Sequence, residues 1–473
     1  MIEYPESTKD ARELEAMRGA ELIYFVIPEA VLWSTVNIMA ILDGPIDLDV
    51  LKNRVMHTFL RFHRLRQRPV RKKKEFYWET VDSVHVEQHI RVIDVEGTTQ
   101  AGMNALLSES MSTPLDISRP LWELVYVPRY EDGAAVILRI HHAYGDGRAL
   151  QAIATSILEA SPEASLQRLE VAGAPVRHKA VAESIRPPGM RRSKGYSRNQ
   201  ATGFAARFTR GLRSYIRSMK KMAAAFQKDH HTGFDDAPSA ERVAAFSRPL
   251  SRSRLRKASA QIECTLNDFV LSGIAGAVRN HLRQSGKDPA MTRLTVVIPV
   301  DLHSPRSLKE MKQKGVLTNH LGTVSMQLPI AVADGAERAR IVERAMTESI
   351  ESREPQMQYK SLSSFHKMPQ GLLVRMFRSQ AHKMSGIVSN IAGSKQPYYL
   401  AGQRMRSWLF WVSAPQLAGA HLGVSVSHYM DEIRIGLTLP TNTGYDVRQL
   451  VEDMAAETEK LMEQSLAAAG VRS

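Results

Sequence analysis

The sequence has a single cysteine, Cys264, among 473 residues. An intramolecular disulfide and a cysteine-based zinc cluster are therefore excluded, and a reducing, cytoplasmic setting is the simplest interpretation. The first residues are too acidic and polar for a secretory signal. The most apolar long stretch, Ala20–Leu42, is interrupted by Glu21, Pro28 and Asn37, and it predicts core strands in preference to a membrane span.

Acidic residues are missing from one long segment. Arg186–Lys228 contains 12 Lys or Arg and no Asp or Glu. The whole chain has a formal charge of +14, from 63 Lys and Arg against 49 Asp and Glu, and outside this segment the balance is only +2. The protein is thus near neutral with one basic segment. Nucleic acid is not expected as a partner, because no recognised motif or aromatic stacking pattern accompanies the charge.

The length predicts two domains, because 473 residues exceed what one ordinary core accommodates. Composition changes from about residue 161 to residue 240, where Pro and Gly interrupt regular structure. We therefore predict an N-terminal domain (1–165), a basic crossover linker (166–240) and a C-terminal domain (241–473).

The linker contains a pattern typical of an amphipathic helix. Apolar residues from Phe208 to Phe226 share one face, and the basic residues lie largely off it. One interpretation is peripheral contact with an anionic membrane or a lipid droplet surface. The alternatives are attraction of a phosphorylated co-substrate and a crossover helix whose basic face is simply solvated.

Helices and strands are predicted in both halves. A helix is expected after Asp47, a hairpin is expected around Gly133, and Thr265 with Asp268 resembles a capping box. Further β-rich runs and a final amphipathic helix follow: 294–298, 323–328, 422–428 and 450–466. This mixture predicts the α/β or α+β class.

The sharpest feature is the run His141-His142-Ala143-Tyr144-Gly145-Asp146-Gly147, which follows an apolar strand and precedes a helix. Imidazole is the side chain best suited to accept a proton near neutral pH, so a histidine here predicts a general base. Asp146 could fix the loop by holding an arginine or a backbone group, and Gly147 permits backbone angles that other residues resist. The alternatives are a structural turn or a metal pair. Adjacent histidines on a strand cannot easily face one metal, so no metal is expected.

This HHxxxDG pattern resembles the superfamily of acyl-CoA-dependent acyltransferases and peptide-synthetase condensation domains. The chain looks most like its wax ester synthase/diacylglycerol acyltransferase branch. The supporting segments are Pro114–Glu123, which contains Pro-Leu-Trp, and Asn267-Asp268, Asn319–Gly322, Ser389–Gly393 and Gln396–Gly402.

The chain also departs from that pattern at two places. Arg18–Phe25 stands where the family usually has Ser-Pro-x-Asp followed by Phe. Pro299-Val300-Asp301-Leu302-His303 stands where many members have Pro-Val-Ser-Leu-Arg. These departures leave acyl transfer as the expected chemistry and leave the acceptor alcohol open.

The resemblance implies a fold of two chloramphenicol-acetyltransferase-like halves, each a mixed sheet with helices, joined by a long crossover around a central tunnel. It implies that His142 deprotonates the acceptor hydroxyl, which then attacks the acyl-CoA thioester. His141 would orient the site, Asp146 would be structural, and Arg66 best matches the arginine that pairs with this aspartate. Asn267, beside Asp268, would orient substrate or stabilise the oxyanion.

Several of these residues also have simpler structural interpretations. Asn267 and Asp268 could only start a helix, and Arg66 could be a solvated basic residue. Trp122 is expected in the core. Cys264 is expected to be a packed residue and not a nucleophile.

The implied activity is O-acyl transfer from a long-chain acyl-CoA, as co-substrate and without a cofactor, to a fatty alcohol or diacylglycerol. The products would be wax ester or triacylglycerol, and the expected location is the cytoplasm, with peripheral contact at the inner membrane or lipid inclusions. Two alternatives stay open: an acyltransferase of the same superfamily that uses a carrier-protein thioester or a natural-product hydroxyl, and a catalytically silent protein that binds lipid or membrane.

Overall fold

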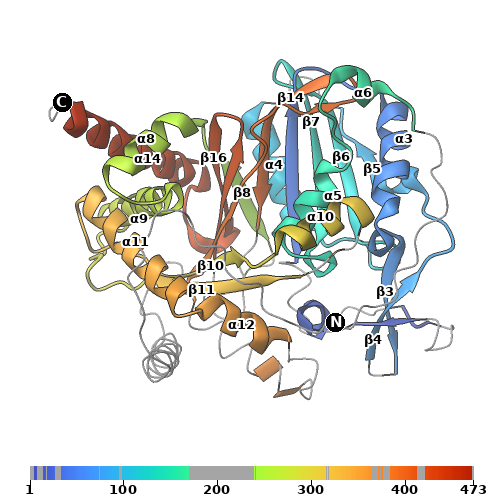
Figure 1. Ribbon diagram of the computed structural model, residues 1–473, viewed down its shortest axis with the longest axis horizontal. Helices are drawn as coiled ribbons and strands as arrows, with labels where there is room; N and C mark the ends of the chain where they lie inside the picture. The colour runs from blue at the N-terminus through green and yellow to red at the C-terminus, as the bar shows by residue number, and fades with distance from the viewer. Residues whose placement is uncertain are drawn as a thin grey trace, which may run out of the picture.

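The computed structural model describes residues 5–7, 14–17, 19–26, 34–73, 75–94, 99–169, 239, 241–315, 317, 319–363, 371–372, 374–375, 384–412 and 421–470. Two sheet-rich halves lie side by side (Figure 1). The first half is coloured blue to teal, apart from two orange strands that come from late in the chain, and the second half runs from green to red. The basic segment with its predicted amphipathic helix lies outside the described residues, so its contact with membrane, CoA or solvent stays a prediction.

The first half is built on a six-stranded sheet in the order β13-β14-β2-β7-β6-β5. Its strands are β2 (Thr35–Leu42), β5 (Ile90–Val92), β6 (Trp122–Tyr130), β7 (Gly133–His141), β13 (Tyr399–Leu400) and β14 (Gln403–Trp411). The antiparallel pair β6–β7 turns between Tyr130 and Gly133, so the predicted hairpin is confirmed. A small sheet, β1 (Glu15–Ala16), β4 (Glu75–Thr80) and β3 (Gln67–Lys72), flanks this half.

Alternate residues of β2 point into two cores. Met39 and Ile41 pack with α4 (Gln100–Ser112) on one face. Ile38 and Ala40 belong to the larger core on the other face. That core also takes in residues of α3 (Leu48–Thr58) and α5 (Gly147–Thr155), and the short α6 (Pro162–Leu166) follows. All eight residues of β2 are buried, because the strand is covered on both faces.

The second half is built on the sheet β11-β10-β12-β15-β16-β8, with β9 paired to β16. Its strands are β8 (Arg242–Phe246), β9 (Leu250–Ser251), β10 (Thr295–Asp301), β11 (Leu321–Gln327), β12 (Gly386–Ile391), β15 (Leu422–Tyr429) and β16 (Glu432–Pro440). β10 continues past Pro299, because it stays paired with β11 as far as Asp301. On its other side, the described pairing with β12 ends at Val297, so that side of Pro299 carries no ladder, which is where a strand tolerates proline.

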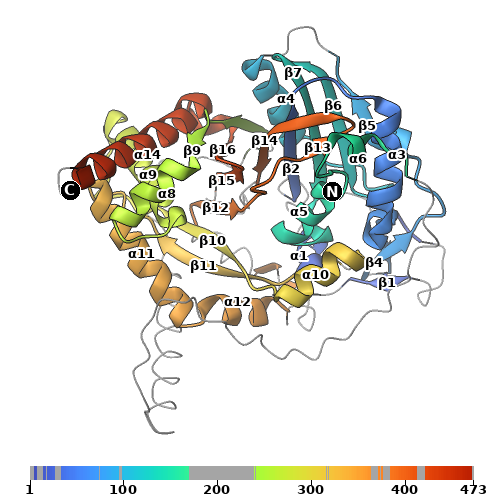
Figure 2. The same cartoon turned by 45° about the horizontal axis from the view of Figure 1, so that its top comes forward.

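Helices gather on the outer side of the second sheet (Figure 2). They are α8 (Arg252–Gln261), α9 (Leu266–Gln284), α11 (Gly335–Glu351), α12 (Glu354–Ser363) and α14 (Val447–Gly470). α10 (Pro305–Lys314) lies apart from them and packs against α5 of the first half. α9 and α14 bury their apolar faces in one core with β15 and β16. The final amphipathic helix predicted from the sequence is therefore confirmed.

One strand crosses from the second half into the first sheet. β14 comes late in the sequence, yet it pairs with β2 from Met405 and Leu42 to Trp411 and Asn37. The Oγ of Ser427 in β15 accepts a hydrogen bond from the Phe410 backbone N at 3.1 Å. The mixed α/β class with two sheet-rich halves is confirmed, and this strand joins them directly. The predicted boundaries at 165 and 240 remain predictions.

Local capping predictions are confirmed. The Asp47 carboxylate caps α3, and Thr265 with Asp268 forms a reciprocal capping box at the start of α9. The prediction of strands through Ala20–Leu42 is wrong for its first part, because Ile23–Val26 is a helical turn. Within the described part of the chain, no helix is long and apolar enough to cross a membrane.

Candidate active site

The HHxxxDG run forms a strand-turn-helix corner. β7 ends at His141, a 3-10 turn covers His142–Tyr144, and α5 begins at Gly147. Asp146 is the N-cap of α5, where its Oδ1 accepts hydrogen bonds from the backbone N of Arg148 at 3.0 Å and of Ala149 at 3.1 Å. A carboxylate satisfies the free N–H groups of a first helical turn, and this explains why the chain turns sharply here.

His141 is held by contacts on both ring nitrogens. Its Nε2 lies 2.8 Å from the Ser34 Oγ, and its Nδ1 accepts from the Ala143 backbone N at 3.2 Å. The ring stacks on Phe25, with centroids 5.2 Å apart. Burial, together with the neighbouring His142, lowers the pKa of His141 to about 3. The ring is therefore neutral and has a partner on each nitrogen, and its expected role in orienting His142 stays a prediction.

His142 has different surroundings. Its ring stacks on Tyr24 at a centroid distance of 5.4 Å. Its Nδ1 is buried and forms no hydrogen bond to any described residue. Burial lowers the pKa of His142 below its usual value, although backbone groups and the Asp146 charge oppose this. The ring is therefore neutral at neutral pH and able to accept a proton.

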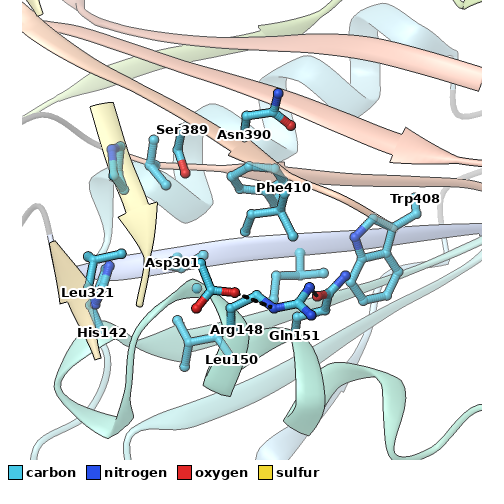
Figure 3. A pocket seen from close by; sticks show the side chains of 16 residues that line it. His142, Arg148, Leu150, Gln151, Asp301, Leu321, Ser389, Asn390, Trp408 and Phe410 are labelled. Carbon is cyan, nitrogen blue, oxygen red and sulfur yellow. Dashed lines mark hydrogen bonds and ion pairs between the residues drawn. The ribbon is translucent and has the colours of Figure 1, made fainter. Parts of the chain in front are cut away.

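His142 lines a cavity of about 80 Å³ to which both halves contribute (Figure 3). The wall is mostly apolar. Its apolar members are Val36, Ile38, Leu150, Pro299, Leu321, Ile391, Trp408, Phe410 and Val412, together with Gly147. Its polar members, besides His142, are Arg148, Gln151, Asp301, Ser389 and Asn390. A second hollow of about 180 Å³ shares Arg148 and Gln151 with it. An apolar cavity with a few convergent polar groups is the usual form of a small-molecule site.

The crossing strand matters here, because Trp408 and Phe410 of β14 form part of the wall. Ser389 and Asn390 of β12 come from the second sheet, and His142 comes from the first half. The cavity thus exists only where the two halves meet.

Asp146 also contacts the second half. Its Oδ2 accepts from the His320 backbone N at 2.8 Å and lies 3.6 Å from the His303 Nε2. Arg66 forms no ion pair with Asp146 in the described part of the chain, so the expected pairing is wrong. Arg66 ends a 3-10 turn that leads directly into β3 of the small sheet, and its carbonyl accepts from the Val81 backbone N.

Asn267 lies one contact away from the cavity. Its Oδ1 accepts a hydrogen bond of 2.8 Å from the Nδ2 of Asn390, which is in the cavity wall. Asp268 faces the other way and closes the capping box, where its Oδ2 accepts from the backbone N and Oγ1 of Thr265. Burial raises the pKa of Asp268. Of this pair, only Asn267 is connected to the site.

Gly147 leaves room for a neighbouring side chain of the second half, Ile391. Its backbone is outside the left-handed region, contrary to the expectation of an unusual backbone angle. A Cβ on Gly147 would lie 3.1 Å from the Ile391 Cδ1, which is tighter than an ordinary contact. The glycine therefore allows α5 of the first half to approach β12 of the second half closely.

Trp122 and Cys264 lie away from the chemistry. Trp122 is buried in the core, where its Nε1 donates to the Leu65 carbonyl and its ring stacks on His89. Burial raises the pKa of the Cys264 thiol to about 12, which leaves it protonated and unreactive. Among the residues that the structure describes, no cluster of His, Cys, Asp and Glu could hold a metal ion.

Three further residues form a chain beside the cavity that sequence reasoning did not assign. The Arg148 Nε lies 3.3 Å from the Asp301 Oδ2, as Figure 3 shows by a dashed line. The Asp301 Oδ1 lies 2.8 Å from the His303 Nδ1. The only sequence signal was the departure of residues 299–303 from the family pattern, and their contact with the first half could not be deduced from it.

Two family models match the chain. The wax ester synthase/diacylglycerol acyltransferase catalytic domain matches residues 44–270, and the WS/DGAT C-terminal domain matches residues 317–462. A putative diacylglycerol O-acyltransferase of Mycobacterium tuberculosis is 28% identical over 417 residues, which are 84% of this chain and 79% of that protein. A probable diacylglycerol O-acyltransferase of the same species is 23% identical over 363 residues, 74% of each chain.

Solved structures share the fold. The wax ester synthase/diacylglycerol acyltransferase from Marinobacter aquaeolei VT8 has a TM-score of 0.63 at 16% identity, covering 95% of this chain and 100% of that one. The first condensation domain of the calcium-dependent antibiotic synthetase has a TM-score of 0.60 at 14% identity, covering 96% and 97%. Together, the two family models span most of the sequence, from the motif half to the final helix. The chain therefore belongs to the wax ester synthase/diacylglycerol acyltransferase family and is an O-acyltransferase.

Proposed function

We propose that the protein transfers a long-chain fatty acyl group from acyl-CoA to the hydroxyl of a fatty alcohol or diacylglycerol, with His142 as the general base. The observation that carries this proposal is that His142, whose pKa burial lowers, lies in the wall of a mostly apolar cavity. A neutral imidazole at such a cavity is suited to take a proton from an alcohol.

The proposed reaction is one direct displacement. The His142 Nε2 removes the hydroxyl proton while the oxygen attacks the thioester carbonyl. The carbon–sulfur bond of the resulting tetrahedral intermediate breaks, the ester is released, and the CoA sulfur takes the proton from His142. No acyl-enzyme forms, and no cofactor is required.

Asn267 is proposed to act through Asn390. Their hydrogen bond of 2.8 Å fixes the Asn390 amide at the cavity wall. A positioned amide donor could stabilise the negative oxygen of the tetrahedral intermediate, and one such donor is worth about 3–4 kcal/mol. The apolar wall would hold acyl chains by burial, which contributes about 0.8 kcal/mol for each CH₂ group.

The Arg148–Asp301 ion pair favours a second candidate. It places two charged, partly exposed side chains in the cavity wall, where they offer polar partners to an acceptor that carries further polar groups. The second candidate is therefore transfer to a polar hydroxyl compound, such as a natural product, or from a carrier-protein thioester.

The deciding experiment supplies palmitoyl-CoA with hexadecanol, with diacylglycerol or with no acceptor, and follows thiol release and lipid products. We expect acceptor-dependent release that His142→Ala reduces by about 100- to 10,000-fold, which is the usual contribution of a general base. His85→Ala is the matched control, because His85 is exposed and the described contact of its side chain is with nearby Ser83.

Full activity in a folded His142→Ala protein would contradict the base assignment. Activity with a polar alcohol but with neither lipid would favour the second candidate. Lipid binding without turnover of any thioester would favour a catalytically silent lipid-binding protein.

A further inference from the structure

His303 is buried between two carboxylates that come from different halves. Its side chain is 0% exposed. Its Nδ1 lies 2.8 Å from the Asp301 Oδ1 on β10, and its Nε2 lies 3.6 Å from the Asp146 Oδ2 at the start of α5. The second of these contacts spans the boundary between the halves, directly beside the corner that carries His142.

The proton count decides what this arrangement can do. A protonated imidazole has two N–H donors and can serve both carboxylates, whereas a neutral imidazole has only one. After proton loss, one ring nitrogen turns a lone pair toward a carboxylate oxygen. The link to Asp146 or the link to Asp301 must then weaken.

The charge count leads to the same result. Asp146 and Asp301 are two negative groups, and Arg148, paired with Asp301 at 3.3 Å, is one positive group. With His303 protonated, the formal charges of these four side chains sum to zero, and with His303 neutral one negative charge is in excess. Because the Asp146 side chain is only 1% exposed, water screens that charge little, and the backbone N–H groups of Arg148, Ala149 and His320 offset it in part.

Other titratable and charged groups surround the cluster. The His320 ring lies 5.1 Å from the His303 ring, and Tyr359 of α12 packs on the far side of His320. On α10, Arg306 pairs with Glu310 at 3.3 Å, and Arg306 is 87% exposed, so this pair is largely solvated. The groups on the side of the first half are Arg148, Tyr24 and His142.

We propose that protonated His303 is a positioning residue, which holds the Asp146 corner of the first half against β10, and that acyl transfer loses rate on the alkaline side as His303 releases its proton. This inference rests on the proposed function of His142. When His303 releases its proton, its contact with the Asp146 Oδ2 weakens. The corner that carries His142 is then held less firmly against β10.

The consequence is a bell-shaped pH profile. Activity should rise with pH as His142 becomes neutral, and it should fall again at higher pH as His303 becomes neutral. Two variants separate the rise at low pH (the acidic limb of the profile) from the fall at high pH (the alkaline limb). Asp301→Asn is nearly isosteric and removes one carboxylate, so the alkaline limb should shift to lower pH by about one unit or more. His303→Arg supplies a permanent cation with several donors, so the alkaline limb should disappear.

The test measures kcat against pH for wild type, Asp301→Asn, His303→Arg and the exposed-site control His85→Arg, which should follow wild type. An alkaline limb that stays unchanged in both folded active-site variants would overturn the proposal. If His303→Arg does not fold, because its side chain is larger, Asp301→Asn alone decides the question by the position of its limb.

A second measurement separates this proposal from the proposed function. Stabilisation by the protonated ring is present at low pH and is lost as pH rises through its titration. The midpoint of thermal unfolding of wild type should therefore fall relative to His303→Arg across that window, even if no thioester is turned over. If the midpoint of thermal unfolding changes with pH in the same way in wild type, His303→Arg and Asp301→Asn, the positioning role is refuted, whether or not the enzyme is active.

Discussion

Replacing Asp146 with Asn separates the two roles of this carboxylate, which are capping α5 through Oδ1 and contacting the second half through Oδ2. The Oδ1 accepts two backbone N–H groups at the start of α5, and an asparagine Oδ1 can accept both of them. The Oδ2 accepts from the His320 backbone N at 2.8 Å and faces the His303 Nε2 at 3.6 Å. In Asp146→Asn, an NH₂ group takes the place of Oδ2. This donor then faces the His320 backbone N–H and the His303 Nε2, which are themselves donors.

The magnitude follows from those contacts. A buried backbone N–H without its acceptor costs about 1–3 kcal/mol, and loss of one partner from a buried ion pair costs about 3–5 kcal/mol. Because the His303 distance of 3.6 Å is long for a hydrogen bond, we expect a total near the lower values, about 2–4 kcal/mol. Asp146→Ala should cost about 1 kcal/mol more, since it also removes the helix cap.

The assay is urea unfolding at neutral pH, followed by both fluorescence and circular dichroism so that an intermediate would be detected. Asp47→Asn is the matched control. Asp47 caps α3 by accepting from the backbone N of Asp49 and Val50, with no further partner on its carboxylate in the described part of the chain. Asparagine caps as well as aspartate, so this control should change stability little. If Asp146→Asn is as stable as Asp47→Asn, the link between the halves through Oδ2 is refuted.

Two other predictions concern residues around the motif. Ser34→Ala removes the partner 2.8 Å from the buried His141 Nε2, so it should cost about 1–3 kcal/mol and lower kcat by disordering His142. Ser83→Ala, which breaks the exposed pair with His85, should stay within about 0.5 kcal/mol of wild type, and an equal effect of both changes would contradict this interpretation. Cys264 has a pKa of about 12, so at mildly alkaline pH iodoacetamide should label the folded protein roughly a thousandfold more slowly than the urea-unfolded chain. Rapid labelling of the folded protein, or loss of activity in Cys264→Ala, would contradict its assignment as a packed residue.

The parts of the fold that the sequence predicted well depend on short stretches of chain. The Asp47 cap, the hairpin closing at Gly133 and the Thr265 capping box each involve residues only a few positions apart. Side-chain chemistry and turn geometry determine such features locally. The helical turn Ile23–Val26 was missed, because four apolar residues fit a buried strand equally well.

The crossing strand could not be predicted in the same way. β14 is typical of a buried strand, with apolar residues from Trp408 to Trp411, but its composition does not identify its partner. Pairing with β2 brings together Asn37 and Trp411, which are 374 positions apart in the sequence. Only the tertiary fold selects that register.

The same distinction holds for the site. The motif identified His142, because its residues are contiguous and their chemistry is distinctive. Arg66 was expected to pair with Asp146 because it best matches the arginine that has this role in the family. His303 fills that place because β10 ends opposite the first turn of α5, and no pattern within either segment reveals this meeting.

The two halves of this enzyme are parts of one catalytic unit, and the crossing strand explains why. All eight residues of β2 are buried, with β7 pairing one edge and β14 the other. Without β14, the first half would expose a buried strand as an open edge, which proteins avoid. It would also lose Trp408 and Phe410 from the wall beside His142, and the Asp146 Oδ2 would lose its contacts to His303 and His320. A first half expressed alone would therefore retain the complete HHxxxDG motif but lack the part of the cavity wall that the second half supplies and the contacts of Asp146 with His303 and His320.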